Sequence, residues 1–219
     1  MEEKNTSNSK IAAIIKPRIH HQKKQKLEDV APLKTPFSVH IDVCSLCNFR
    51  CSFCFQADKL GKKEKNFPHG MMKMDLFKKT VDNLKTFPDR IKKIKIGNHG
   101  EPTLHPLLPK FIEYARKSDV ADIIEVFTNG SKLNQKLNKE LVDAGLQRIN
   151  ISLEGLSSER YLKVAAAKIN WDEFVSNVRD LYSYSRKNGD LNIYVKIINH
   201  ASELKGKTVF SMTDEEKDI

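Results

Sequence analysis

Four cysteines are the residues of this sequence whose type and spacing point most directly to chemistry. Cys44, Cys47, Cys51 and Cys54 are all the cysteines of the 219-residue chain, and they fall within eleven residues. The sequence shows no export signal, so we expect a reducing compartment, where clustered thiols bind metal rather than form disulfides. Metal ligation is therefore the leading explanation of this run.

The spacing of the cysteines separates two kinds of metal centre. Two CxxC pairs are typical of four-thiolate zinc sites, but those pairs generally come from two turns separated by about a dozen or more residues. Here only three residues separate Cys47 from Cys51. In a [4Fe–4S] cluster each thiolate binds a different iron, so a single loop can supply the ligands. The spacing favours the iron–sulfur cluster, and zinc stays as the alternative.

The elements that must position this loop alternate between strands and helices. Runs rich in β-branched residues predict strands at 37–43, 92–96, 123–128, 148–153 and 191–198. Apolar residues spaced at i, i+3, i+4 and i+7 predict helices at 74–86, 106–118, 132–144 and 171–187. The connections are too long for hairpins, which predicts an α/β fold with parallel strands, as an open doubly wound sheet or a barrel.

Both architectures gather functional residues at the carboxyl ends of their strands. The unusual residues of the sequence follow the predicted strands in turn: the cysteine run, then 97–102, 128–130, 152–155 and 199–200. We therefore expect these segments to meet at one edge of the sheet.

The stretch from Cys47 to Cys54 resembles the CxxxCxxC motif of the radical S-adenosylmethionine (radical SAM) superfamily, with the aromatic Phe53 before the last cysteine. From about residue 36 onward the chain also resembles the core domain of that family in the order of its motifs. It looks most like the subgroup called SPASM proteins, with their C-terminal extension absent. The resemblance implies a parallel partial TIM barrel, (β/α)6-like, with 37–219 as the core domain.

The resemblance also implies an activity and its cofactors. Cys47, Cys51 and Cys54 would ligate three irons of a [4Fe–4S] cluster, and S-adenosylmethionine would bind the fourth iron. An electron from a donor such as flavodoxin or ferredoxin would cleave S-adenosylmethionine reductively, giving methionine and a 5'-deoxyadenosyl radical. That radical would take hydrogen from an unknown substrate, which the sequence leaves open among peptides, sugars and other small metabolites.

Four further residues match positions of the family that bind S-adenosylmethionine. Gly100 and Glu101 match the Gly-Gly-Glu element that receives the methionine amino group, although His99 replaces its first glycine. Phe53 would pack beside the adenine, and Ser152 would lie near the ribose. Gly100, Glu101 and Ser152 also have a purely structural explanation, since 100–101 precede a helix start and serine is common at strand ends.

Three positions are left open by the motif. Cys44 lies three residues before the first motif cysteine. It is either a bystander thiol near the cluster or a residue with a redox or alternative ligand role. Asn129 is equally compatible with a turn and with a cofactor contact. Lys168 is a candidate for the methionine carboxylate, which many relatives bind with an arginine after the fourth strand.

Composition and charge exclude other classes of protein. The chain is 39% hydrophobic, and its apolar run at 11–15 is far shorter than the roughly 18 to 20 residues of a membrane span. The net charge of +10 is dispersed, as on a solvated surface rather than a nucleic-acid footprint. We expect a cytoplasmic protein with neither a membrane nor a nucleic-acid partner. Residues 1–36 lack periodicity and predict a flexible basic arm.

Two alternatives accompany the enzyme hypothesis. One is a zinc-stabilised basic module that binds nucleic acid. The other is a cluster-binding fragment without independent activity. A capping-box pattern at 213–216 is followed by only three residues, so we expect a core domain truncated after about five strands.

Overall fold

The computed structural model describes residues 26–54, 70–197, 201–204 and 207–210. The chain divides into two compact units, Met1–Leu33 and Lys34–Ile219, and each is considered by itself. In the first unit the described residues contain one 3-10 turn, η1 (Leu27–Asp29). Most of the predicted arm, at 1–25, lies outside the described residues, as does the capping-box pattern at 213–216.

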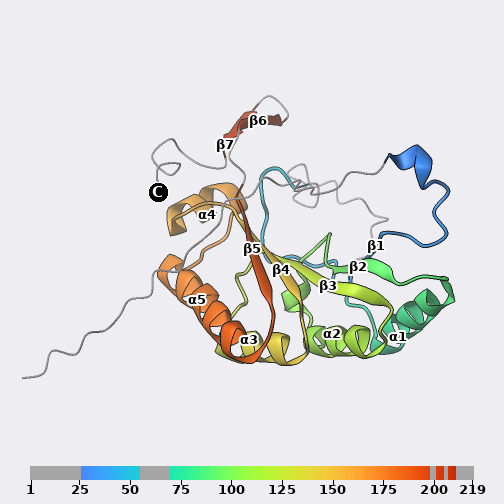
Figure 1. Ribbon diagram of the computed structural model, residues 1–219. Coiled ribbons are helices and arrows are strands. Elements are labelled where there is room, and N and C mark those ends of the chain that lie inside the picture. Colours follow the sequence, from blue (N-terminus) through green and yellow to red (C-terminus); the bar gives the residue numbers. More distant parts are fainter. Residues whose placement is uncertain (1–25, 55–69, 198–200, 205–206, 211–219) are drawn as a thin grey trace, which may run out of the picture. The chain divides into compact units, whose positions relative to one another are not determined.

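The second unit is built on a five-stranded sheet, and all neighbouring strands in it are parallel. The strands lie in chain order across the sheet (Figure 1): β1 (Ser38–Ile41), β2 (Ile91–Ile96), β3 (Ala121–Thr128), β4 (Arg148–Leu153) and β5 (Asn192–Ile197). The five predicted parallel strands of an α/β fold are confirmed. The first is shorter than predicted, because from Val43 the chain leaves β2 and bonds to Met72 instead.

Helices cross between successive strands. They are α1 (Met74–Asn83) with the 3-10 turn η2 (Leu84–Thr86), the 3-10 turn η3 (Pro102–Leu104), α2 (Leu108–Lys117), α3 (Gln135–Asp143), α4 (Ser158–Ala165) and α5 (Trp171–Asn188). The four predicted helices are present. The sequence analysis missed α4 and an antiparallel hairpin formed by β6 (Ala201–Leu204) and β7 (Lys207–Phe210).

The two faces of the sheet differ in chemistry. Helices α1, α2, α3 and α5 lie along one face (Figure 1), where Ile94, Ile124 and Ile149 are fully buried in the main core. Burying an isoleucine side chain contributes about 2 kcal/mol. Because side chains alternate along a strand, their neighbours Lys95, Glu125 and Arg148 project from the opposite face.

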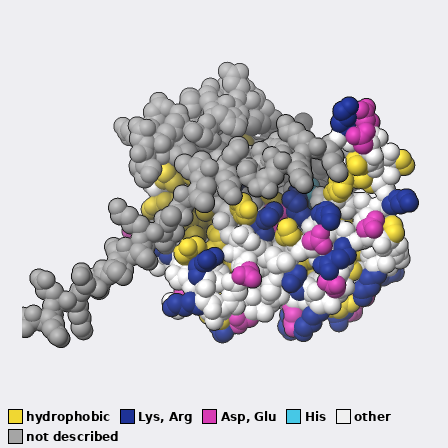
Figure 2. All heavy atoms as spheres, in the orientation of Figure 1, with side chains coloured by type: hydrophobic (Ala, Val, Ile, Leu, Met, Phe, Trp, Pro, Cys, Tyr) yellow, Lys and Arg dark blue, Asp and Glu magenta, His cyan; other side chains and the backbone are white. Residues whose placement is uncertain are grey.

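Surface charge is mixed rather than concentrated. Figure 2 shows lysines and arginines interspersed with acidic side chains over the visible face of the described part. No helix among the described residues has the length and apolar character of a membrane span.

Candidate functional site

The cysteine loop leaves the carboxyl end of β1 with its first part anchored in the core. Cys44 is fully buried, and its thiol lies 3.6 Å from the Leu46 carbonyl oxygen. The backbone here runs antiparallel to residues 70–72: the Ser45 N–H donates to the Gly70 carbonyl at 3.0 Å and the Met72 N–H donates to the Val43 carbonyl at 2.8 Å. Cys44 therefore serves packing in this structure.

The three motif cysteines lie in the more open part of the loop. Cys47, Cys51 and Cys54 are half-buried, and none of them is in a disulfide. The Cys47 sulfur accepts the Phe49 N–H at 3.4 Å. Burial raises the pKa of the Cys47 and Cys51 thiols, and the Glu154 carboxylate raises the pKa of Cys51 further. Metal binding at these two residues would therefore have to displace protons.

Helix α4 supports this open part of the loop. The Arg50 N–H donates to the Ala165 carbonyl at 2.7 Å, and the Ser52 N–H donates to the Val164 carbonyl at 2.8 Å. The buried ring of Phe49 meets Tyr161 edge to face, with centroids 5.8 Å apart. This helix, which was not predicted, thus holds three of the residues between the motif cysteines.

Glycine at position 100 lets the loop after β2 approach the cysteine loop. Gly100 has φ +79°, a conformation that costs other residues energy. A Cβ there would collide with the Cys44 carbonyl oxygen and would lie 2.9 Å from the Leu46 carbonyl oxygen. The next residue closes the contact, since the Glu101 N–H donates to the Leu46 carbonyl at 2.7 Å. The two segments predicted to share a site are therefore in contact.

Glu101 is buried, and both of its carboxylate oxygens accept hydrogen bonds. Its Oε1 accepts from the Thr103 N–H at 3.0 Å, the Thr103 hydroxyl at 2.5 Å and the Thr128 hydroxyl at 2.6 Å. Its Oε2 accepts the Asn129 N–H at 2.6 Å. Burial raises its pKa, and these donors oppose that rise. The carboxylate joins the end of β3 to the loop after β2, and its predicted role toward a methionine amino group stays a prediction.

Asn129 connects the end of β3 to the cysteine loop. Its side-chain N–H donates to Asn48 Oδ1 at 3.0 Å and lies 3.9 Å from the Cys47 sulfur. Its Oδ1 accepts the Ser131 hydroxyl at 2.7 Å, and Asn48 donates to that hydroxyl oxygen at 2.8 Å. A proton-donating amide beside a ligand sulfur is a device that tunes metal centres. The sequence analysis left this residue open between a turn and a contact.

His99, which departs from the family's glycine, pairs with a carboxylate. Its Nδ1 lies 2.8 Å from Asp42 Oδ2, while Asp42 Oδ1 accepts the backbone N–H groups of Asn98 and His99 at 2.7 and 3.0 Å. Burial tends to raise the pKa of Asp42, but these hydrogen bonds outweigh it and lower that pKa. Asp42 thereby fixes the loop between β2 and Gly100.

The remaining predicted residues lie at the same edge of the sheet or in the loop. Ser152 is half-buried near the end of β4, opposite Lys196 of β5. Phe53 is half-buried in the cysteine loop. The neighbouring Glu154 is 7% exposed, and burial raises its pKa to about 7 while Lys196 opposes the rise. The structure thus brings the segments after β1, β2, β3 and β4 to one edge.

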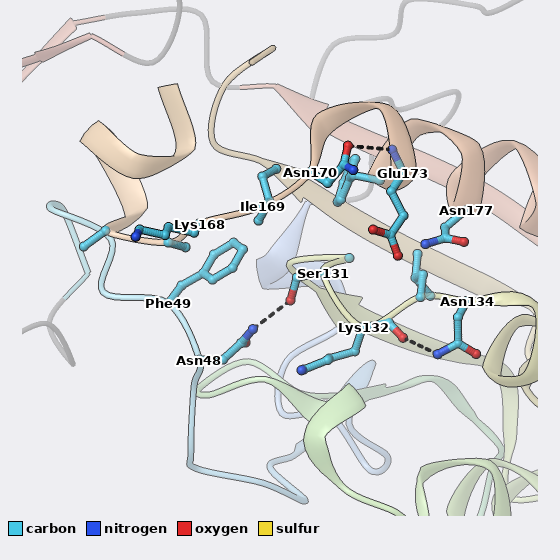
Figure 3. A pocket seen from close by; sticks show the side chains of 15 residues that line it. Asn48, Phe49, Ser131, Lys132, Asn134, Lys168, Ile169, Asn170, Glu173 and Asn177 are labelled. Atoms are coloured by element: carbon cyan, nitrogen blue, oxygen red, sulfur yellow. Dashed lines mark hydrogen bonds between the residues drawn. The ribbon is translucent and has the colours of Figure 1, made fainter. Parts of the chain in front are cut away.

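A pocket of about 460 Å³ adjoins this edge (Figure 3). Asn48 and Phe49 of the cysteine loop form one wall, and the link between α4 and α5, which includes Lys168, forms another. Lys132 also lines it. The predicted S-adenosylmethionine residues Phe53, Gly100, Glu101 and Ser152 are not among its lining residues. Lys168 therefore shares a pocket with Asn48 and Phe49, and its predicted role toward the methionine carboxylate stays a prediction.

The donors of the cysteine loop are thiols, the ligand type of an iron–sulfur cluster. Among the described residues, no group of three His, Cys, Asp or Glu side chains is close enough to hold one metal ion. A [4Fe–4S] cluster spreads its thiolate ligands over separate irons. Three unpaired, half-buried thiols in one loop match that requirement.

Comparison with known families agrees with the geometry. A model described as "Radical SAM superfamily" matches residues 41–212. The superfamily uses a [4Fe–4S] cluster and S-adenosylmethionine. The match spans the cysteine loop, strands β2 to β5 and the helices from α1 to α5, and it begins at the last residue of β1.

Individual relatives share a part of their length with the chain. A "Tungsten-containing aldehyde ferredoxin oxidoreductase cofactor-modifying protein" of Pyrococcus furiosus is 32% identical over 118 residues, which are 54% of this chain and 31% of the relative. A "Probable GTP 3',8-cyclase" of Methanococcus maripaludis is 35% identical over 130 residues, 59% of this chain and 40% of the relative. The chain thus spans well under half the length of these relatives.

A solved structure shares the fold. The Streptococcus suis protein SuiB, bound to S-adenosylmethionine, superposes with a TM-score of 0.57 at 14% identity. The superposition covers 85% of this chain and 42% of SuiB. At this identity the likeness concerns the fold, and it supports the partial TIM barrel.

Proposed function

Because the chain belongs to the radical SAM superfamily, we propose that residues 37–219 form the core of an enzyme that cleaves S-adenosylmethionine reductively. The observation that carries this proposal is the contact between the motif cysteine loop and the Gly100–Glu101 loop. When bound, the [4Fe–4S] cluster supplies the electron that releases methionine and a 5'-deoxyadenosyl radical, which takes hydrogen from the substrate.

Cys47, Cys51 and Cys54 are the proposed ligands. They come from one loop whose backbone is fixed on α4 by the Arg50 and Ser52 N–H groups. A ligand loop held in place before the cluster binds loses less conformational entropy on binding. Because burial raises the pKa of the Cys47 and Cys51 thiols, cluster binding should release protons and strengthen as pH rises.

Gly100, Glu101, Phe53 and Ser152 are the proposed contacts of S-adenosylmethionine. Glu101 already accepts four hydrogen bonds, about the number that a carboxylate can accept. Three of them go to Oε1 and one to Oε2, so the second lone pair of Oε2 is the proposed acceptor for the methionine amino group. Lys168, which lines the pocket beside Asn48 and Phe49, is the proposed cation for the methionine carboxylate.

The partners follow from this chemistry. A one-electron donor such as flavodoxin or ferredoxin would reduce the cluster, and the cytoplasm would keep the ligand thiols reduced. The two curated relatives carry the names of different reactions, so neither substrate is transferred to this chain. The nucleic-acid alternative receives no support from the dispersed charge in Figure 2.

Anaerobic reconstitution with iron and sulfide tests the proposal. We expect the protein to acquire a [4Fe–4S] spectrum and, with dithionite and S-adenosylmethionine, to form 5'-deoxyadenosine without added substrate. The Cys47→Ala variant should form neither, while Cys44→Ala, which changes a cysteine of the same loop, should form both. A protein that binds zinc in place of the cluster, or that yields no 5'-deoxyadenosine once the cluster has formed, would contradict the proposal.

A further inference from the structure

The face of the sheet opposite the helices carries side chains that the proposed cofactor chemistry does not use. Strand register places Lys95, Glu125 and Arg148 side by side on β2, β3 and β4. Their sequence neighbours Ile94, Ile124 and Ile149 are buried against the helices. Alternation along each strand therefore aligns these three charged groups on the helix-free face.

This helix-free face is basic. Along β2 to β5 its charged residues are Lys93, Lys95, Arg148 and Lys196, against the single carboxylate of Glu125. The pKa of His40, opposite Lys95 on β1, is lowered by burial and then by the Lys95 ammonium. The Glu154 carboxylate, just after β4, acts on Lys196, and Asp42, just after β1, acts on His40. The four cations still outnumber these carboxylates and Glu125, so the face attracts anions.

Two buried polar atoms at the centre of the face have no hydrogen-bond partner in the described part of the chain. Glu125 is 4% exposed, and its Oε1 accepts from Asn150 at 2.7 Å and lies 3.7 Å from Arg148 Nη1. Glu125 Oε2 and Arg148 Nε are the unpartnered atoms. Leaving buried polar atoms unsatisfied destabilises the protein. A ligand that pairs with both atoms therefore meets an acceptor and a donor that are already desolvated.

Aromatic rings hold the cations in place without neutralising them. The Lys95 ammonium lies 5.7 Å from the centroid of Phe127, and the Arg148 guanidinium lies 5.1 Å from that of Tyr194. Tyr194 is 41% exposed, so the face is open at β5. A cation held over a ring keeps its charge available to a second partner.

We propose that the helix-free face binds a small substrate that carries an oxyanion next to a hydroxyl group. The phosphate or carboxylate oxygens accept from Lys95 and Arg148, and the hydroxyl donates to Glu125 Oε2. This assignment rests on the proposed function, because it names the substrate class of the same enzyme. Both phosphates and carboxylates satisfy the chemistry, and the test separates them.

Calorimetric titration of the reconstituted protein with three probes tests the assignment. The probes are glycerol 3-phosphate, glycerate and glycerol, which differ in the oxyanion alone. We expect one or both of the anions to bind and glycerol not to bind. Lys95→Gln and Glu125→Gln should each weaken binding roughly tenfold, the effect of losing one charge-assisted hydrogen bond. The stronger of the two anions identifies the substrate's oxyanion.

Lys92→Gln is the matched control, because Lys92 lies on the same strand but pairs with Asp122 away from the helix-free face. Circular dichroism confirms that each variant is folded. If Glu125→Gln does not fold, Lys95→Gln alone tests the proposal, because Lys95 is half-buried and makes no ion pair with another described residue. The proposal is overturned if glycerol binds as well as the anions, if neither anion binds, or if Lys92→Gln and Lys95→Gln weaken binding equally. Cluster content and substrate-free 5'-deoxyadenosine, measured on the same preparation, report the proposed function separately.

Discussion

The two ends of the cysteine loop carry the same side chain and use it differently. At the first end, Cys44 is fully buried and its backbone neighbours bond to residues 70–72. At the other end, Cys47, Cys51 and Cys54 are half-buried and accessible to a ligand. Thus four cysteines of one loop divide into a packing residue and three candidate ligands.

The difference shows that the backbone packed around a cysteine, more than the thiol itself, decides whether that cysteine can bind a metal or cluster. The Gly100 backbone packs directly on the carbonyl groups of Cys44 and Leu46, which leaves no room for a bulky ligand there. The motif end instead rests on the edge of α4 through two N–H donors.

Removing a motif cysteine should have the largest effect. Cys47→Ala, Cys51→Ala and Cys54→Ala each delete one of three proposed iron ligands, so each should lose most of the iron after anaerobic reconstitution. Iron and sulfide assays and the electron paramagnetic resonance spectrum of the reduced cluster measure the loss. A variant that keeps the full cluster would remove its cysteine from the ligand set.

Gly100→Ala should disturb the packed end next most strongly. The added Cβ meets backbone atoms of the cysteine loop at φ +79°, so we expect the free energy of unfolding to fall by about 3 kcal/mol or more. Gly145→Ala is the matched control. Its φ of +82° is similar, but its nearest neighbour is the flexible Arg116 side chain at 3.4 Å, so the loss should be about 1 kcal/mol. Equal losses in urea denaturation would show that the close approach at Gly100 is unimportant.

Acid should destabilise the Cys44 end of the cysteine loop through protonation of His105. This 5% exposed histidine accepts the Leu107 N–H at Nδ1 at 3.0 Å, so its Nε2–H donates to the Met72 carbonyl at 3.0 Å, beside the Cys44 segment. Burial lowers its pKa below the ordinary 6.5. The stabilisation that neutral His105 gives the folded state is therefore present above about pH 6.5. It is lost as pH falls through the lower pKa that His105 has in the folded state.

We expect a loss of about 1–2 kcal/mol, because a protonated Nδ1 can no longer accept the Leu107 N–H. Unfolding free energies measured at several pH values check this, with His105→Gln as the comparison. If the variant shows the same slope below pH 6.5 as the unaltered protein, the titration belongs to another group.

Sequence patterns were sufficient for the sheet, while the cysteine ligand set stays a prediction. Strands such as β3 and β4 are β-branched and buried on the helix side, so their composition reports their environment directly. The short α4 was missed because its eight residues show little more than two turns of periodicity. Its importance comes from the carbonyl groups at its end, which bind the cysteine loop.

Contacts between strand ends could not be read from the sequence. Glu101 and Asn129 meet only because β2 and β3 are neighbours, and the sequence separation of their hydrogen bond is 28 residues. A lone glutamate such as Glu125 in a strand likewise shows no sign of its burial until register places Lys95 and Arg148 beside it. Pairwise tertiary geometry, rather than local pattern, determines these positions.

Cys44→Ala should have the smallest effect and sharpen the comparison most. The substitution removes a buried sulfur and its contact with the Leu46 carbonyl, so the free energy of unfolding should fall by about 1 kcal/mol. The cluster content should equal that of the unaltered protein, because the thiol is packed away from the motif end. Iron loss comparable to that of Cys47→Ala would instead make Cys44 a ligand. A stability loss with full iron content would establish that one loop carries two independent uses of cysteine.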